Sequence, residues 1–171
     1  MTPGGEPERV AAVLAHALTQ IEVEHEVRGQ GQFLVTLPGT NRLRTHCWLV
    51  VRAQALFVQA FVCRRPDEAS DVVYRFLLQR NARLYGVHYM LDRVGDIHLV
   101  GRAPLHAVTA DELDRVLGQV LEAADGDFNT LLELGFATSI RREWAWRTDR
   151  GESLANLKAF EHLLTPSEPD R

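Results

Sequence analysis

Residues 45–63, THCWLVVRAQALFVQAFVC, contain two apolar segments on either side of a short polar break. Thr45–Val51 and Leu56–Cys63 carry apolar side chains on both faces of an extended chain. Strands of that composition are typical of the centre of a sheet, covered on both sides. The break Arg52–Gln54 predicts a tight hairpin, so we expect the two segments to pair as antiparallel neighbours.

A second hairpin is predicted farther along the chain, and the apolar pattern indicates its register. A three-residue loop, Arg93–Gly95, puts Gly95 where a left-handed backbone is needed. That loop keeps the apolar residues on one face, whereas a two-residue loop would mix them with His98 and Arg102. The apolar face then consists of Val87, Tyr89, Leu91, Ile97 and Leu99. The opposite face consists of His88, Met90, Asp92, Asp96, His98, Val100 and Arg102.

The segments on either side of these hairpins supply one or two more strands and several helices. Gln32–Leu37 alternates and predicts a strand, whereas Ile21–Val27 predicts either a short strand or an extended lead-in. The predicted helices are Glu6–Thr19, a helix from Pro66–Asp67 to a cap at Gly86, a helix opened by the capping box Thr109–Glu112, Phe128–Leu134, Ser139–Arg147 and Leu154–Leu164. In the second helix we expect a buried stripe of Val72, Val73, Phe76 and Leu77, with Arg75, Gln79, Arg80 and Arg83 facing water. Asp125–Asp127 breaks the third helix, and Asp127 is the expected cap of the next.

The order of elements predicts an α+β fold: an antiparallel sheet flanked by helices, in the order α-β-β-β-α-β-β-α. Further helices follow, so we expect one domain over residues 1–171 with a C-terminal helical extension over about 136–171. The chain has 171 residues, of which 46% are hydrophobic and 25% charged, and these fractions suit an ordinary globular domain.

Composition also bears on the compartment and on the kind of partner. Two cysteines are too few for a secreted disulfide framework. The N-terminal residues MTPGGEPERV have no signal-peptide pattern, and no apolar run approaches membrane-spanning length. We therefore expect a cytoplasmic protein that does not associate with a membrane. A net charge of −4 argues against nucleic acid as a partner.

Charge is distributed unevenly, which favours an interaction surface. Residues 42–65 hold five arginines and no acid, whereas residues 109–135 hold seven acids and one arginine. We expect either an acidic helix packed near basic strands, or a partner that recognises one of these faces. The candidate partner-binding residues are Arg42, Arg44, Arg52, His88, His98 and Arg102.

Motifs for catalysis or metal binding are weak. His88 and His98 share a face with two aspartates, but the predicted register does not converge them on one ion. Cys47 follows His46, and neighbours on a strand point to opposite faces. We therefore expect no enzyme activity, no metal and no cofactor.

The segment Ser139–Arg147, SIRREWAWR, concentrates two tryptophans and three arginines. Guanidinium groups bind carboxylates and phosphates, and tryptophan rings stack on cations or rings, so one interpretation is an anion or acidic-peptide site. In the other, the tryptophans anchor a C-terminal helix to the core and the arginines pair with the acidic helix. The candidate ligand-binding residues are Arg141, Arg142, Trp144, Trp146 and Arg147.

Four stretches carry a resemblance to a known family: FLVTLPGTNRLRTHCWLVV, FVCRRPDE, YGVHYMLDRVGDIHLVGR and FNTLLELGF with ATSIRREWAWR. Over about Val10 to Leu164 the chain resembles the YbjN family in its actinobacterial form. The resemblance implies a fold like that of type III secretion chaperones, often as a homodimer. Relatives in that family are described as sensory or stress regulators, and the best-known members of the fold bind unfolded segments of other proteins.

These observations predict a non-enzymatic, homodimeric protein-binding module of the cytoplasm, with a chaperone-like or regulatory role on an unidentified protein partner. Exposed apolar grooves and sheet edges would hold an extended segment. The alternative is a small-ligand sensor that binds an anionic metabolite at the arginine- and tryptophan-rich segment 139–147.

Overall fold

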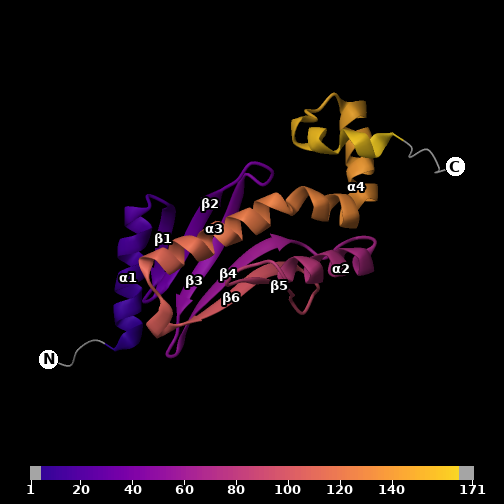
Figure 1. Ribbon diagram of the computed structural model, residues 1–171. Coiled ribbons are helices and arrows are strands. Elements are labelled where there is room, and N and C mark those ends of the chain that lie inside the picture. The colour runs from indigo at the N-terminus through magenta and orange to yellow at the C-terminus, as the bar shows by residue number, and fades with distance from the viewer. Residues whose placement is uncertain (1–4, 166–171) are drawn as a thin grey trace.

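The computed structural model describes residues 5–165, which form helices packed on a single sheet (Figure 1). The elements in chain order are α1 (Glu6–Gln20), β1 (Glu24–Gly29), β2 (Gln32–Pro38), β3 (Arg44–Val51), β4 (Ala55–Cys63), α2 (Ser70–Asn81), β5 (His88–Leu91), β6 (Ile97–Pro104), the 3₁₀ turn η1 (Leu105–Ala107), α3 (Ala110–Gly126), α4 (Phe128–Arg150) and the 3₁₀ helix η2 (Ala155–Leu164).

The sheet has six antiparallel strands in the order β1-β2-β3-β4-β6-β5. The α+β prediction is therefore confirmed, and β3 and β4 lie at its centre as expected. The segment Ile21–Val27 was predicted to be either a short strand or an extended lead-in. The structure has a strand there, β1, shifted to Glu24–Gly29. Four strands consequently precede α2, one more than the predicted order contained.

The predicted register of the β5–β6 hairpin is confirmed. Asp92 N–H donates to Asp96 O at 3.0 Å across the three-residue loop, and Gly95 has a φ of 91°. The apolar face of this hairpin is buried except for Leu91, which is 39% exposed because it ends the edge strand β5.

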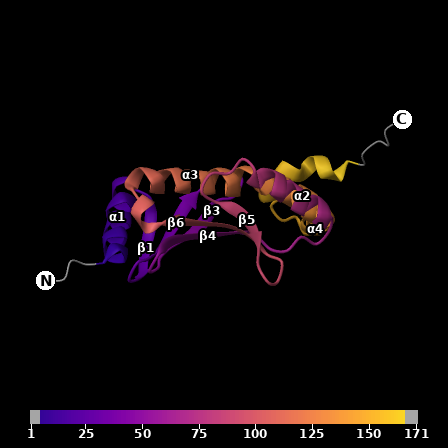
Figure 2. The ribbon, with the colours of Figure 1, turned by 60° about the horizontal axis from the view of Figure 1, so that its bottom comes forward.

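The central strands are buried on one face only, which corrects the prediction that both faces are covered. Along β3, Thr45, Cys47 and Leu49 are fully buried, whereas His46 and Trp48 between them are exposed. Helices α1, α2 and α3 all lie on the same side of the sheet, and no helix or strand of residues 5–165 covers its opposite side (Figure 2). We call this opposite side the open face of the sheet.

Helix α3 begins as the capping box predicts, because Thr109 Oγ1 accepts a hydrogen bond from Glu112 N–H at 3.1 Å. The helix expected to end at Gly135 continues to Arg150 through a kink at Phe136, whose φ is −143°. The two predicted segments 128–134 and 139–147 are thus two arms of one kinked helix. The last predicted helix is present as the 3₁₀ helix η2.

Helix α2 departs from its prediction at both ends and on one face. It begins at Ser70 rather than at Pro66–Asp67, and it ends at Asn81, well before Gly86. Val73 and Leu77 are buried, but Val72 is 44% exposed.

Arg80 and Asp127 form an ion pair between α2 and the α3–α4 junction, which overturns two predictions. Arg80 Nε donates to Asp127 Oδ2 at 2.7 Å, and the two side chains are 19% and 12% exposed. The Tyr89 hydroxyl lies 2.8 Å from the same carboxylate oxygen. Arg80 therefore does not face water, and the Asp127 carboxylate does not cap α4, because Arg80 and Tyr89 engage it.

Asp125, near the end of α3, anchors the loop between β2 and β3. Its Oδ1 accepts hydrogen bonds from the backbone N–H groups of Thr40, Asn41 and Arg42 at 2.9, 2.8 and 2.8 Å. The acidic helix and the basic segment thus lie together, as one interpretation of the charge pattern predicted. The contact runs through backbone donors rather than guanidinium groups.

We expect Asp125→Asn to lower the free energy of unfolding by about 1 kcal/mol at pH 7, because it replaces three charge-assisted hydrogen bonds with neutral ones. Partial burial raises the pKa of Asp125, but the N–H groups of Arg42, Thr40 and Asn41 outweigh it and hold that pKa below its ordinary value. The charged form is therefore favoured by folding, and its contribution is lost as the pH falls through the folded-state pKa. Urea unfolding of both proteins from pH 7 to pH 3 should show the difference shrinking at the acidic end. A constant difference would contradict this role.

Candidate functional site

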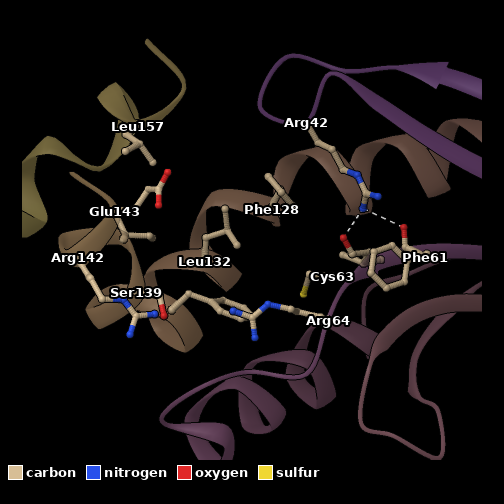
Figure 3. A pocket seen from close by; sticks show the side chains of 13 residues that line it. Arg42, Phe61, Cys63, Arg64, Phe128, Leu132, Ser139, Arg142, Glu143 and Leu157 are labelled. Carbon is tan, nitrogen blue, oxygen red and sulfur yellow. Dashed lines mark hydrogen bonds between the residues drawn. The ribbon is translucent and has the colours of Figure 1, made fainter. Parts of the chain in front are cut away.

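A groove of about 610 Å³ opens between the end of β4 and the helices α4 and η2 (Figure 3). Most of its lining is apolar: Phe61, Val62, Cys63, Phe128, Leu132, Phe136, Ile140 and Leu157. Its polar lining consists of Arg42, Arg64, Ser139, Arg142 and Glu143. Apolar walls with a few polar groups are typical of binding sites.

Arg42 reaches into the groove from the β2–β3 loop. Its guanidinium lies between the rings of Phe61 and Phe128, at 5.6 and 5.5 Å from their centroids. It donates to the backbone oxygens of Arg44 at 3.1 Å, of Phe61 at 2.9 Å, and of Val62. Burial lowers the pKa of Arg42, and within residues 5–165 no carboxylate pairs with it. The groove therefore holds a half-buried cation with neutral partners only.

Arg64, in contrast, is neutralised by Asp67. Its Nη2 lies 2.7 Å from Asp67 Oδ2, and the Ser139 hydroxyl donates to the same oxygen at 2.8 Å. The hydrogen bond from Arg64, followed by that from Ser139, lowers the pKa of Asp67 to about 2. Because Ser139 lies on α4, this network holds α4 beside the segment that follows β4, while the Arg64 guanidinium covers the Phe136 ring at 4.6 Å.

Cys63 lines the groove as a neutral thiol. Burial raises the pKa of Cys63 to about 11, and that of the fully buried Cys47 to about 12. Thiolates are the reactive form of cysteine, so neither residue is suited to act as a nucleophile near neutral pH.

The five ligand-binding candidates of segment 139–147 separate on α4. Arg142 lines the groove and has no hydrogen bond or ion pair with the described residues. Arg141 Nε donates to Leu163 O at 2.8 Å. Trp144 is half-buried, and Trp146 is 45% exposed under Arg150, 4.6 Å away.

Arg147, the fifth candidate, organises the turn after α4. It bonds Glu143 at 2.7 Å, the Ser153 oxygen at 3.0 Å and Asn156 Oδ1 at 2.9 Å. Together with Arg141 it therefore holds η2 against α4. None of the three arginines pairs with the acidic helix α3, which corrects that part of the second interpretation.

Four of the six partner-binding candidates lie on the open face of the sheet: Arg44, His88, His98 and Arg102. Arg42 lies in the groove, and Arg52 lies in the β3–β4 turn. Apolar side chains surround the four: Leu34, Trp48, Val50, Phe57, Phe61, Met90 and Val100. Trp48 and Phe61 are 38% and 42% exposed, so the open face joins basic and aromatic groups.

Aromatic and charged groups on this face are paired with one another. The Arg102 guanidinium lies 4.7 Å from the Phe57 ring centroid, and the His98 ring meets Phe61 edge to face at 5.4 Å. His98 Nε2 also lies 3.4 Å from Asp92. Within residues 5–165 no three His, Cys, Asp or Glu side chains are grouped to hold a metal ion.

Sequence reasoning missed the groove, although one signal could have indicated it. Phe128, Leu132, Phe136 and Ile140 recur every four residues, straight through the expected helix end at Gly135. That stripe predicts a continuous apolar helix face.

In the described part of the chain, no helix is long and apolar enough to cross a membrane.

A family model, YbjN, described as "Putative bacterial sensory transduction regulator", matches residues 10–133. Uncharacterized proteins of Mycobacterium leprae (strain TN) and Mycobacterium tuberculosis (strain H37Rv) are each 56% identical to the chain. The alignments cover 90% of this chain and 83% and 87% of those proteins. The second arm of α4 and η2 lie beyond the residues that the family model matches.

Solved structures with a similar fold are type III secretion chaperones and related complexes. A chain of the HopA1–SchA chaperone–effector complex has a TM-score of 0.53 at 17% identity, covering 72% of this chain and 97% of that one. A chain of the ExsC–ExsE complex has a TM-score of 0.53 at 16% identity, with coverage of 72% and 93%. The chaperone SycH of Yersinia pestis, in complex with a fragment of YscM2, gives 0.52 at 17% identity, with coverage of 67% and 96%. At these identities the likeness concerns the fold.

Proposed function

Because the chain belongs to the YbjN family and has a fold like that of type III secretion chaperones, we propose that it is a non-enzymatic protein-binding module. It works in the cytoplasm as a homodimer, with a chaperone-like or regulatory role on a protein partner. The likeness to chaperones solved with their protein partners supports binding of protein rather than of nucleic acid or membrane.

The observation that carries the proposal is the open face. A six-stranded sheet with strands of about seven residues offers on the order of 500 Å² of flat area. Side-chain relief brings this toward the ~800 Å² that each partner contributes to a standard interface. Partly exposed Trp48 and Phe61 lie among other apolar groups there, and apolar patches of this kind mark interaction sites.

Charge favours a second copy of the chain as the occupant of the open face. Glu24 and Glu26 lie on this face at the β1 edge, since their cross-strand partners are Thr36 and Leu34. Arg102 lies toward the other edge, on β6. A two-fold axis parallel to the strands, through the middle of the sheet, would place the β1 edge of one copy over the β5–β6 edge of the other. The edge that carries Glu24 would then lie over the edge that carries Arg102, while Glu26 keeps its ion pair with Arg28 at 2.6 Å.

We expect Trp48→Glu to raise the dissociation constant of the dimer about 100-fold, because it would bury an unpaired carboxylate in the interface. Sedimentation velocity over a concentration series measures the constant, and circular dichroism confirms that the variant folds. Leu78→Glu is the matched control, since Leu78 is 71% exposed on α2, away from the sheet. A monomeric wild-type protein at several hundred micromolar, or equal effects of the two substitutions, would overturn the dimer.

A second candidate function is a sensor of a small anionic ligand. Arg142, beside the apolar groove, is the observation that favours it, and tryptophans on the same helix provide a signal. A saturable change in tryptophan fluorescence with a phosphorylated or carboxylated metabolite is the expected result.

A further inference from the structure

We propose that the groove between β4 and α4 binds a short acidic segment of a partner protein, with one bulky apolar side chain inserted between the walls and carboxylates at both Arg42 and Arg142. The inference rests on the proposed protein-binding function and adds the site and the chemistry of the bound segment.

Uncompensated positive charge in the groove indicates that the bound segment is negatively charged. The half-buried guanidinium of Arg42 bonds only neutral backbone oxygens, while Arg142 stands at the rim without a partner among the described residues. The carboxylates already near the groove are occupied, because Asp67 bonds Arg64 and Ser139, and Glu143 bonds Arg147. An incoming carboxylate would supply the counter-charge that residues 5–165 do not place there.

The apolar walls require a hydrophobic anchor in the same segment. Phe128 and Leu132 form one wall along α4, and Phe61 lies on the facing wall at the end of β4 (Figure 3). Phe136 of α4 and Val62 of β4 line the same groove. A bulky apolar side chain that enters a pocket of this kind contributes most of the affinity of a peptide anchor.

The groove is open to solvent rather than enclosed, which favours a peptide segment over a small ligand. Small-molecule sites usually enclose most of the surface of their ligand. The walls are also held in place before binding, since Asp67 bonds Ser139 and Glu68 Oε1 accepts from Thr138 N–H at 2.6 Å. Fixed walls reduce the entropic cost of binding.

The test uses a fluorescein-labelled peptide of about 12 residues in which Asp and Glu alternate with Leu and Phe. Its counterparts replace the acids with Lys, or the apolar residues with Ala. Fluorescence anisotropy with the full chain should show saturable binding of the acidic apolar peptide, and each counterpart should bind at least about tenfold more weakly. Higher salt should also weaken the binding.

Variants locate the bound peptide. Arg142→Glu should weaken binding at least about tenfold, whereas Arg150→Glu, the same charge change outside the groove on the same helix, should change it less than about twofold. Trp48→Glu should leave the affinity unchanged, because Trp48 lies outside the groove. This variant separates the groove from the open face and the inference from the dimer.

Three results would overturn the inference: no binding of the acidic peptide at about 100 µM, equal binding by the Arg142→Glu variant, or equal binding of the Lys counterpart. Decanoate and inorganic phosphate test the small-ligand alternative. Binding of either one that Arg142→Glu removes, without binding of the peptide, would assign the groove to a small anion. If the wild-type protein is a dimer in sedimentation velocity, none of these results contradicts the proposed homodimer.

Discussion

Asp127→Ala is expected to lower the free energy of unfolding by about 3 kcal/mol, because it leaves the charge of Arg80 without its partner in a largely buried position. Arg80 also reaches Glu122 at 3.0 Å, but that carboxylate is mostly exposed. The Tyr89 hydroxyl would lose one acceptor and keep Ala123 O at 3.0 Å. Chemical denaturation at pH 7 measures the loss.

Two further variants separate the ion pair from general effects. Arg75→Ala removes an exposed arginine from the same helix, so we expect a change within about 0.5 kcal/mol. In a double-mutant cycle, Arg80→Ala combined with Asp127→Ala should cost clearly less than the two single losses added together. Additive losses would show that the pair is not coupled.

The position of this ion pair connects stability to the proposed site. Asp127 stands between α3 and α4, while Arg80 comes from α2 and Tyr89 from β5. The pair therefore holds the start of α4 against the rest of the domain. Since α4 forms one wall of the groove, we expect variants of this pair to weaken peptide binding indirectly, in step with their loss of stability.

The elements that could be predicted from the sequence are those with local signals. The β5–β6 register follows from alternation and from Gly95, which lies within the hairpin itself, and the start of α3 follows from Thr109 and Glu112, three residues apart. Such features depend on contacts between near neighbours in the chain. Their prediction therefore did not require the rest of the fold.

The features that escaped prediction depend on distant parts of the chain. Arg80 and Asp127 are 47 residues apart, and Asp67 and Ser139 are 72 apart. The open face was predicted only in part, because the exposed side of the β5–β6 hairpin was expected but that of β3 and β4 was not. Apolar side chains on both faces of β3 suggested two covering layers, but Trp48 lies on a face that no helix of the described chain covers.

The candidate site was predicted only in part. Arg42 and Arg142 were both singled out, but for two different surfaces, and the structure brings them to one groove. The kink at Phe136 redirects the second arm of α4, and the apolar stripe of that helix becomes a wall. Helical periodicity alone does not predict such a change of direction.

Gly101→Ala is expected to lower the free energy of unfolding by about 3 kcal/mol, because the chain entering β5 passes directly over Gly101 of β6. A Cβ atom at this position would overlap the Gly86 carbonyl oxygen and meet Val87 Cγ1 at 3.0 Å. The backbone there has little freedom to move away, since Gly86 turns the chain with a φ of 67° and the next residues pair with β6.

Gly118→Ala is the matched control for Gly101→Ala, and the opposite sign is expected. Gly118 lies within α3, and apart from its chain neighbours and the backbone of its own helix no atom lies within 4 Å of the position where its Cβ would be. An alanine there should raise the free energy of unfolding by about 0.5–1 kcal/mol, the usual difference in helix propensity. Thermal and urea unfolding of both variants measure the two shifts. A loss of less than about 1 kcal/mol in the free energy of unfolding of Gly101→Ala would contradict the prediction. It would show that the chain at Gly86 can move away from β6 without disturbing the packing of β5.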